Sequence, residues 1–314
     1  MADLTDCVGL VGCGRWGQKH LDVLQHLRSS GVLNRLVVCD TDPTALVNLD
    51  VDATYTTLDD MVDNETLDAA AVVTPPNTHL TIMAVLAELD IPLLVEKPLS
   101  DDQVAVEPAL DRLSANTTLF VGFLLRHHPS VQRLHETVVK GDLGRLRSFE
   151  YRRTTVRASP MGANALSTLA VHGLDLLAFM ADAPLMDGEV ETFLAEPTRA
   201  FVVMRMGNGI HGTIEVAWDA KEERRLVAVE GEFGRGEVDF GTDMAHIVVN
   251  GTATSSPPPL RSALEEEWLT FLSAVEEAEP QVHPPVAVLR DQAMWLARYG
   301  ASNVADSDLH GCEN

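Results

Sequence analysis

The amino-acid sequence predicts an α/β protein with a doubly wound parallel sheet, followed by an α+β domain with an open, mainly antiparallel sheet. Over residues 1–122, short and continuously apolar segments alternate with amphipathic ones, which is typical of parallel strands covered by helices on both faces. Beyond that point, longer segments alternate apolar and polar residues. The turn signals GNG and GEFGRG separate these segments, as expected between antiparallel strands.

We expect the first domain to span residues 1–122. Its strands are predicted from short apolar runs and its helices from the amphipathic segments between them. The expected strands are Cys7–Val11, Leu36–Cys39, Ala70–Val73, Leu93–Val95 and Thr118–Gly122. The expected helices are Trp16–Leu27, Pro43–Leu49, Thr78–Leu89 and Val104–Leu113, and Asp101 is a candidate N-cap.

We expect the second domain to span residues 123–314. A helix at Pro129–Val139, a strand at Leu146–Val156 and a long apolar helix at Ala163–Met180 precede the alternating segments at residues 199–218 and 224–240. Two further helices, Arg261–Ala278 and Val286–Ala301, close the chain. We expect these two helices to pack back toward the first domain.

Composition limits the class of protein. The net charge of the 314 residues is −24, and only four residues are lysine: Lys19, Lys97, Lys140 and Lys221. This acidic excess predicts a halophilic protein, since such a surface stays hydrated in strong salt; the alternative is an ordinary acidic protein. No basic stripe suggests nucleic acid, no apolar run reaches the roughly 20 residues that span a bilayer, and no leader pattern opens the chain. We therefore expect a cytoplasmic protein.

The cysteines and histidines do not suggest a metal site. Cys7, Cys13, Cys39 and Cys312 lack paired or metal-like spacing, so we expect reduced thiols. The adjacent pair His127–His128 resembles a metal motif only superficially, because neighbours on a chain point apart.

A glycine-rich loop joins the first strand to the first helix. In VGLVGCGRWGQKH, Gly12, Gly14 and Gly17 form a GxGxxG pattern in the context that binds a dinucleotide. The three glycines would allow the tight turn, the approach of a pyrophosphate and close helix packing. A helix N-terminus then faces the phosphates. The alternative is a glycine-rich turn without a nucleotide.

Asp40 ends the second strand, near the expected spacing for an acid that binds the adenine ribose. It would accept both ribose hydroxyls of NAD and repel the 2′-phosphate of NADP, and no arginine follows it. The sequence therefore favours NAD. The alternative role for Asp40 is capping the helix at Pro43, which Asp42 fits better.

Two further segments follow strands at the edge where ligands bind in open parallel sheets. The segment VVTPPNTH offers Thr74 and Asn77 to the nicotinamide half of the cofactor, whereas His79 is also compatible with a simple first-turn position in a helix. In LLVEKPLS, Pro98 holds Lys97 in an extended loop just past a strand. A solvated surface lysine is the alternative for Lys97.

The long apolar helix carries a polar stripe. Thr168, His172 and Asp175 lie at i, i+4 and i+7, surrounded by leucine and valine. A buried polar stripe needs partners or a ligand, so we favour a site role over a satisfied core histidine. Arg126 adds a cation at the domain junction.

Together these segments resemble the Gfo/Idh/MocA family of NAD(P)-dependent sugar and cyclitol oxidoreductases, over nearly the whole chain. The segments that carry the resemblance are GCGRWG (Gly12–Gly17), TPPNTH (Thr74–His79), EKP (Glu96–Pro98), VGFLLRHHP (Val121–Pro129), GDLGRL (Gly141–Leu146) and HGLD (His172–Asp175). The resemblance implies a Rossmann domain and an open-sheet domain with the active site between them. It also implies a homo-oligomer, a dimer or a tetramer.

The resemblance also implies roles for single residues. Lys97 would hydrogen-bond the substrate hydroxyl, and His172 would take its proton as hydride passes to NAD. A desolvated lysine near a cation has a lowered pKa, which suits proton transfer. Asp175 would bind a second sugar hydroxyl, and Arg126 would contact the substrate or the carboxamide. The cofactor-binding set would be Gly12, Gly14, Arg15, Trp16, Gly17, Asp40, Thr74, Pro75, Asn77, His79, Glu96 and Lys97.

The chain departs from the family pattern where an aspartate commonly precedes the histidine by four residues. Thr168 stands there, so it is the candidate substrate-binding group and the orientation of His172 is in question. The sequence looks most like the subgroup that acts on nucleotide-activated amino sugars, such as UDP-N-acetylglucosamine 3-dehydrogenases. The alternatives are an inositol or free-aldose dehydrogenase, an NAD-retaining glycosidase and a non-enzymatic NAD sensor.

Overall fold

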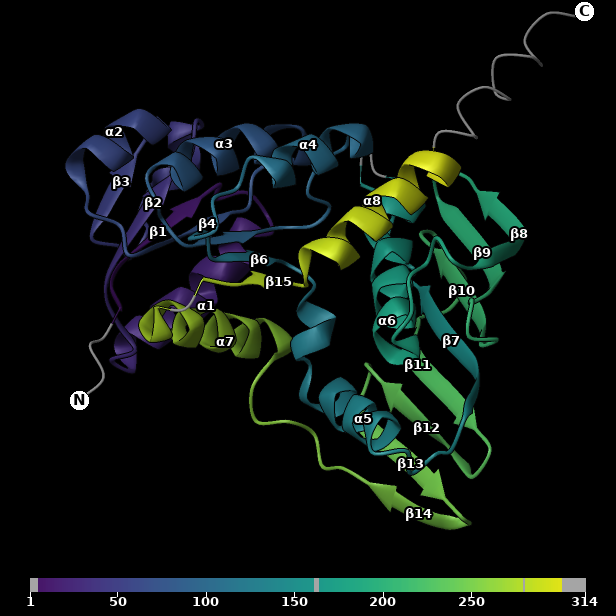
Figure 1. Ribbon diagram of the computed structural model, residues 1–314. Coiled ribbons are helices and arrows are strands. Elements are labelled where there is room, and N and C mark those ends of the chain that lie inside the picture. Colours follow the sequence, from purple (N-terminus) through teal and green to yellow (C-terminus); the bar gives the residue numbers. More distant parts are fainter. Residues whose placement is uncertain (1–4, 161–163, 279, 301–314) are drawn as a thin grey trace, which may run out of the picture. The chain divides into compact units, whose positions relative to one another are not determined.

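A computed structural model describes residues 5–160, 164–278 and 280–300 (Figure 1). Its residues divide into two compact units. The described residues of Met1–Phe123 and Leu264–Ala287 form unit 1, and those of Leu124–Ala263 and Val288–Asn314 form unit 2. The segment Leu264–Ala287 therefore belongs to unit 1, although it follows most of unit 2 in the sequence.

Unit 1 is a seven-stranded sheet in the order β15-β6-β5-β4-β1-β2-β3, and every adjacent pair is parallel (Figure 1). Its strands are β1 (Thr5–Val11), β2 (Leu33–Cys39), β3 (Ala53–Tyr55), β4 (Ala69–Val72), β5 (Leu93–Val95), β6 (Leu119–Val121) and β15 (Val282–His283). The four residues of β4 and the three of β5 are all buried, as expected for central parallel strands. The predicted doubly wound parallel sheet is confirmed.

Helices cover both faces of this sheet. They are α1 (Gly17–Ser29), η1 (Pro43–Leu46), α2 (Leu58–Asn64), α3 (Pro76–Glu88), η2 (Gln103–Ala105), α4 (Val106–Asp111) and α7 (Ala263–Glu277). Side chains of α1 and α7 share one core cluster with the sheet, whereas α2, α3 and α4 lie on the other side in Figure 1. From α7, Trp268 and Phe271 are fully buried in that cluster. This apolar face explains why α7 belongs to unit 1 although it follows unit 2 in sequence.

Several local expectations for unit 1 need correction. The short elements β3, α2 and β15 were not predicted. Asp101 is not the capping residue: Asp102 precedes the 3-10 turn, and its side chain accepts a hydrogen bond from the backbone N–H of Val104. The predicted helix Pro43–Leu49 shortens to η1, which Asp42 caps as expected through the backbone N–H of Thr44.

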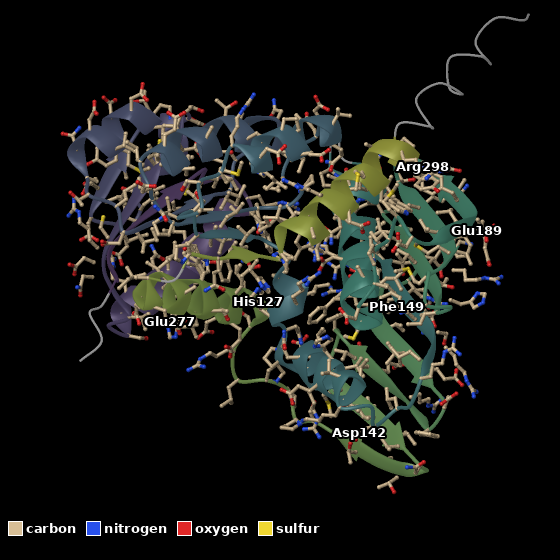
Figure 2. All side chains as sticks on the ribbon, viewed as in Figure 1. His127, Asp142, Phe149, Glu189, Glu277 and Arg298 are labelled. Carbon is tan, nitrogen blue, oxygen red and sulfur yellow. The ribbon has the colours of Figure 1, made fainter. Side chains whose placement is uncertain are left out.

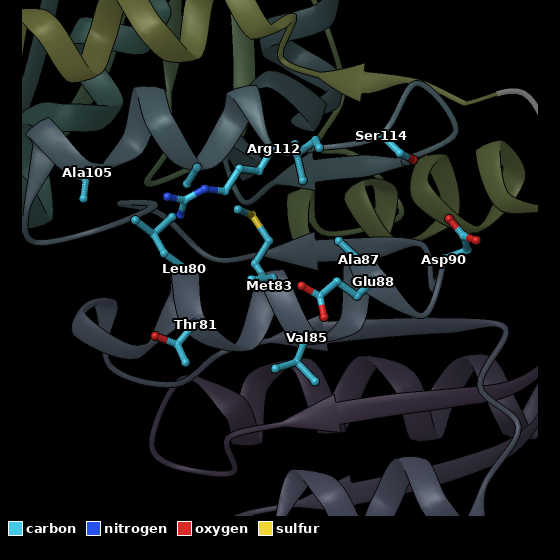
Figure 3. A pocket seen from close by; sticks show the side chains of 13 residues that line it. Leu80, Thr81, Met83, Val85, Ala87, Glu88, Asp90, Ala105, Arg112 and Ser114 are labelled. Carbon is cyan, nitrogen blue, oxygen red and sulfur yellow. The ribbon is translucent and has the colours of Figure 1, made fainter.

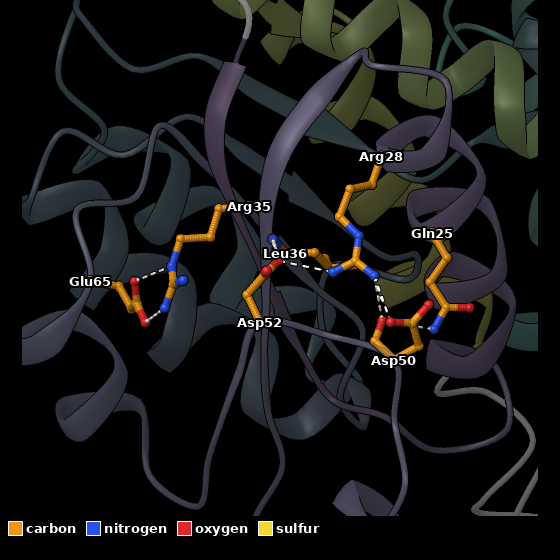
Figure 4. A network of polar contacts seen from close by, with 7 residues as sticks. All are labelled: Gln25, Arg28, Arg35, Leu36, Asp50, Asp52 and Glu65. Carbon is orange, nitrogen blue, oxygen red and sulfur yellow. Dashed lines mark hydrogen bonds and ion pairs between the residues drawn. The ribbon is translucent and has the colours of Figure 1, made fainter.

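Ion pairs fix the outer strands of unit 1 (Figure 4). The guanidinium of Arg28 on α1 binds Asp50 and Asp52, each at 2.9 Å. Arg35 on β2 donates two hydrogen bonds to Glu65, at 2.8 and 2.7 Å. These pairs join helix, strand and loop, and they place acidic residues where an arginine partly offsets their charge.

Unit 2 is an eight-stranded sheet in the order β14-β13-β12-β11-β7-β10-β9-β8. Its strands are β7 (Leu146–Thr154), β8 (Glu189–Ala195), β9 (Arg199–Arg205), β10 (His211–Ala217), β11 (Arg224–Gly231), β12 (Gly234–Asp239), β13 (Met244–Val249) and β14 (Thr252–Ser255). All adjacent pairs are antiparallel except β7 with β10, which is parallel. The predicted, mainly antiparallel sheet is confirmed.

Helices pack on one face of this second sheet. They are η3 (Leu124–His127), α5 (Pro129–Val139), a π-helical turn η4 (Leu166–Ala170), α6 (Val171–Ala181) and α8 (Val286–Gly300). Gly173 of α6 lies so close to β7 that an added Cβ would meet the Tyr151 ring at 2.4 Å. Phe149 on β7 is buried on the same side (Figure 2). The start of the predicted helix, Ala163, lies outside the described residues.

The three cysteines within the described residues, Cys7, Cys13 and Cys39, are buried free thiols; Cys312 lies outside that part of the chain. Burial raises the pKa of Cys7 and of Cys39 to about 11, so both stay protonated at neutral pH. Within the ranges that the structure describes, no helix is long and apolar enough to cross a bilayer.

Candidate functional site

The glycine loop of unit 1 has the steric requirements of a dinucleotide turn. Gly12 has a φ of +97°, and a Cβ there would lie 2.8 Å from the backbone of Val73 and Thr74. A Cβ on Gly17 would lie 2.1 Å from the carbonyl oxygen of Gly12. Gly14, in contrast, faces open space with no atom within 4 Å of an added Cβ. The loop therefore leaves room beside Gly14 for a pyrophosphate.

Asp40 connects the end of β2 to this loop. Its carboxylate accepts hydrogen bonds from the backbone N–H groups of Cys13 at 2.6 Å and Asp42 at 2.9 Å. Because a carboxylate has about four acceptor sites, two remain for the hydroxyls of a ribose. Arg15 is exposed, and Trp16 is 41% exposed at the N-terminus of α1.

The segment after β4 forms the next part of the same edge. Pro75 and Asn77 are exposed, and Thr74 accepts a hydrogen bond from Thr78 at 2.7 Å. His79 is only 1% exposed, and its ring nitrogens lie 2.7 Å from the carbonyl oxygen of Thr74 and 3.0 Å from that of Pro98. This geometry gives His79 a supporting role between two loops, and direct contact with a cofactor stays a prediction.

Lys97 follows β5 at the carboxyl edge of the sheet. It is half-buried, whereas the preceding Glu96 is 4% exposed and turned into the protein. The indole N–H of Trp16 donates to Glu96 Oε1 at 2.7 Å. This bond ties the segment that carries Lys97 to the glycine loop, 80 positions earlier in the sequence.

In unit 2, His172 lies at the first turn of α6, directly after the π-helical turn. It is half-buried. Thr168 lies within the π-turn, donates to the carbonyl oxygen of Asn164 at 2.6 Å, and accepts a hydrogen bond from the Trp218 indole at 3.3 Å. π-turns are frequent at functional sites, because the extra residue redirects the side chains that follow.

Arg126 and Asp175 form a buried ion pair, which differs from the substrate contacts expected of them. The guanidinium donates three hydrogen bonds to the carboxylate at 2.8–3.0 Å, and Asp175 is 1% exposed. Gln292 on α8 donates a further bond to Asp175 at 2.6 Å. The two groups therefore neutralise each other inside unit 2, and direct substrate contact by either residue stays a prediction.

The sequence reasoning missed several polar residues next to the predicted ones. Gln292 and Trp218 bind the stripe of α6, and His20, Trp268 and Glu267 lie behind Glu96. The only local signal was a polar residue on the apolar face of a predicted helix, as for His20 in α1 and Glu267 in α7.

A hollow of about 700 Å³ lies between α3 and α4 of unit 1 (Figure 3). Met83 from α3 and Arg112 after α4 are among its lining residues, most of which are aliphatic. None of the predicted site residues lines it, so it is separate from the candidate site.

Comparison with known proteins assigns both units to one family. The sequence profile described as "Oxidoreductase family, NAD-binding Rossmann fold" matches residues 7–123, and that of the "GFO/IDH/MocA C-terminal domain" matches residues 131–237. The chain belongs to the Gfo/Idh/MocA oxidoreductase family. It is an NAD-binding enzyme that acts on a CH–OH group, as the sequence predicted.

The relatives of this Gfo/Idh/MocA protein differ in substrate. An inositol 2-dehydrogenase of Corynebacterium glutamicum is 25% identical over 253 residues, which cover 74% of this chain and 73% of the relative. A UDP-N-acetylglucosamine 3-dehydrogenase of Acidithiobacillus ferrooxidans is 24% identical over 229 residues, or 68% and 72% of the two chains. A solved levoglucosan dehydrogenase, in complex with NADH and levoglucosan, superposes with a TM-score of 0.81 at 17% identity, covering 96% and 98%. This last likeness concerns the fold.

Proposed function

We propose that the protein is an NAD-dependent dehydrogenase of a secondary alcohol on a sugar or cyclitol ring, with Lys97 and His172 as its acid–base pair. The bond from Trp16 to Glu96 carries the proposal, because it fixes the lysine segment to the glycine loop at the cofactor edge of unit 1. Bound NAD would be the hydride acceptor. The open space at Gly14 supports a dinucleotide, and the remaining acceptor sites of the Asp40 carboxylate, which would repel a 2′-phosphate, support NAD rather than NADP.

The chain's own residues would manage the proton. The Lys97 ammonium group would donate a hydrogen bond to the reacting hydroxyl and hold its oxygen in place. The imidazole of His172 would accept the hydroxyl proton while the hydride leaves the same carbon, which becomes a carbonyl. Such acid–base assistance contributes roughly 10²–10⁴-fold to the rate.

A cyclitol such as inositol is the first candidate substrate, since inositol 2-dehydrogenases recur among the relatives. The test offers NAD with inositols, free aldoses and UDP-N-acetylhexosamines in molar KCl, and follows reduced nicotinamide. Lys97→Ala and His172→Ala should each abolish turnover while NAD still binds, whereas the exposed Lys140→Ala should remain active. Full activity in either site variant would exclude the proposed pair.

A nucleotide-activated sugar is the second candidate, and Arg153 favours it. This residue follows Tyr151 by two positions on β7 and so faces the same side of the sheet as α6. Its cross-strand neighbour Arg225 is engaged by Glu223 at 2.9 Å. Burial, and then the charges of Arg225 and Arg157, lower the pKa of Arg153. An arginine in such surroundings gains from an anionic ligand, such as a diphosphate.

Kinetics separate these candidates. If the substrate is anionic, Arg153→Gln should raise KM for a UDP-sugar at least about tenfold, which corresponds to loss of roughly 1.4 kcal/mol of binding. The same change should leave KM for inositol unaltered. Sugar release without net NADH would instead indicate a glycosidase that retains NAD. NAD binding without any turnover across the panel would indicate a sensor.

A further inference from the structure

A chain of buried polar groups lies behind Lys97 in unit 1. The carboxylate of Glu96 accepts the Trp16 indole N–H at 2.7 Å, and the same oxygen lies 3.1 Å from Nε2 of His20. Its other oxygen accepts the backbone N–H of Lys97 at 3.1 Å. One carboxylate therefore joins the glycine loop, helix α1 and the lysine segment.

Trp268 on α7 fixes the protonation of His20. The Trp268 indole N–H lies 3.1 Å from Nδ1 of His20, and both side chains are fully buried. Because an indole can only donate, Nδ1 must accept and holds no proton. The neutral ring then carries its proton on Nε2 and donates it to Glu96. His20 thus contributes a hydrogen bond to Glu96 but no positive charge.

Glu267 on α7 is the second acid of this region. It is 1% exposed, and neither carboxyl oxygen has a hydrogen-bond partner among the described residues. Burial, and then the charge of Glu96, raise the pKa of Glu267 well above its ordinary value. Glu267 therefore holds its proton to a higher pH than an ordinary glutamate, and the negative charge of the pair belongs to Glu96.

The position of the Glu96 carboxylate depends on Gly122, which follows β6. A Cβ on Gly122 would lie 2.8 Å from the carboxyl carbon and from one of its oxygens, closer than such atoms ever approach. The glycine thus leaves space for the carboxylate. Two segments far apart in sequence, the glycine loop and the end of β6, are shaped around this one group.

We propose that Glu96 is a positioning residue for Lys97: its carboxylate holds the Lys97 backbone and is the counter-charge that keeps the side chain protonated until substrate binds. The charged and titratable groups that face Glu96 are His20 from α1, His79 from α3, Glu267 from α7 and Lys97 itself. His20 is neutral because its Nδ1 accepts the indole N–H of Trp268, and burial favours the neutral form of Glu267. The importance of this role for catalysis rests on the proposed function.

The scarcity of lysine makes the proposal measurable without any substrate. Trace acetylation from neutral to alkaline pH, read by peptide mass spectrometry, gives a titration midpoint for each lysine, and Lys140 and Lys221 are internal references. Glu96→Gln should lower the titration midpoint of Lys97 by about one pH unit, which raises its labelling rate at neutral pH roughly tenfold. Glu107→Gln, an exposed change on α4 that removes the same charge, should leave that midpoint in place. Equal midpoints for Lys97 in the two variants would overturn the proposal.

A second variant covers the case in which Glu96→Gln does not fold. Gly122→Ala displaces the carboxylate without removing it, so the Lys97 midpoint should again fall; an unchanged midpoint would overturn the proposal. A shifted midpoint together with full turnover by Lys97→Ala would support the positioning role of Glu96 and overturn the proposed function. The two ideas can therefore fail separately.

Discussion

Glu267 shows how one buried residue makes stability depend on pH. Its raised pKa means that the folded protein keeps a proton that the unfolded chain releases at the ordinary glutamate value. Glu267 therefore makes its full contribution to the unfolding free energy in acid. This contribution declines as the pH rises above the ordinary glutamate pKa, until the carboxyl group of the folded protein also ionises.

Glu267→Gln removes this dependence and keeps the shape of the neutral acid. Relative to the wild type, the variant should gain about 1 kcal/mol in unfolding free energy for each pH unit, between mildly acidic and neutral pH. Urea unfolding at several pH values measures this difference. Glu276→Gln, an exposed change on the same helix, is the control and should give a curve parallel to the wild type. A parallel curve for Glu267→Gln would show that its carboxyl is ionised in the folded protein.

The sequence predicted single residues best where local chemistry restricts them. Gly12 and Gly17 were predicted from their spacing, and backbone contacts in the structure leave no room for a side chain at either position. The bonds of Glu96 to Trp16 and His20 were not predicted, because they join residues 80 and 76 positions apart. Periodicity reports which face of a helix is buried, but it does not report which distant helix lies against that face.

At the scale of elements, the ion pair between Arg126 and Asp175 connects the turn η3 to helix α6. Asp175→Asn keeps the size of the side chain but leaves the Arg126 guanidinium buried without a counter-charge. We expect it to lower the unfolding free energy by about 3 kcal/mol. The double variant Arg126→Met with Asp175→Leu should recover most of that loss, since no unpaired charge remains. Urea denaturation measures the unfolding free energy of each variant. If the loss in the double variant equals the sum of the losses in the two single variants, the pair is not coupled.

The π-turn before α6 sets the surroundings of His172. Thr168→Asp places a carboxylate where the family commonly has one, within reach of the Trp218 indole. A nearby negative charge favours the imidazolium form, so the acid limb of the kcat/KM profile should move to higher pH. Ser167→Asp adds the same charge one position away and should move the limb less. Identical profiles for the two variants would show that Thr168 does not act on His172.

Elements were predictable where the local sequence carries a clear apolar pattern. Helix α5 was predicted at its observed bounds, because its eleven residues begin at Pro129 and carry an amphipathic pattern. The three-residue β3 and the two-residue β15 are too short to show any period, and they exist because neighbouring strands pair with them. The π-turn was missed because the helix is apolar and buried on nearly all sides, so the shift in phase that one extra residue causes leaves no visible break in the pattern.

At the scale of the whole molecule, sequence order and spatial grouping differ. A domain boundary near residue 122 stays a prediction from the change in sequence pattern, whereas unit 1 consists of two segments, Met1–Phe123 and Leu264–Ala287. The return of α7 to unit 1 follows from the apolar face that carries Trp268 and Phe271, which are buried against the sheet. The sequence predicted a helix in this region, and its packing toward the first domain was an expectation.

The net charge of −24 leads to a prediction for the whole chain. In dilute buffer the acidic groups repel one another, and compaction brings them closer. Surface ion pairs such as Lys140 with Glu136, at 3.1 Å, offset this only slightly, since each contributes about 0–1 kcal/mol. In 1 M KCl the screening length falls to about 3 Å, so repulsion between distant charges is lost while burial of apolar surface persists. Repulsion is the larger effect at this net charge, and salt should stabilise the fold.

We therefore expect Tm to rise steadily from dilute buffer to molar KCl, measured by thermal unfolding with a fluorescence readout. A matched variant tests the cause. Glu107→Lys, Glu276→Lys and Glu277→Lys together replace exposed acids on α4 and α7, without touching the core or the candidate site. This variant should have a higher Tm than the wild type in dilute buffer and a smaller rise with KCl, because less repulsion remains to be screened. A rise of the same size in both proteins would attribute the effect of salt to its action on apolar surface instead of on charge.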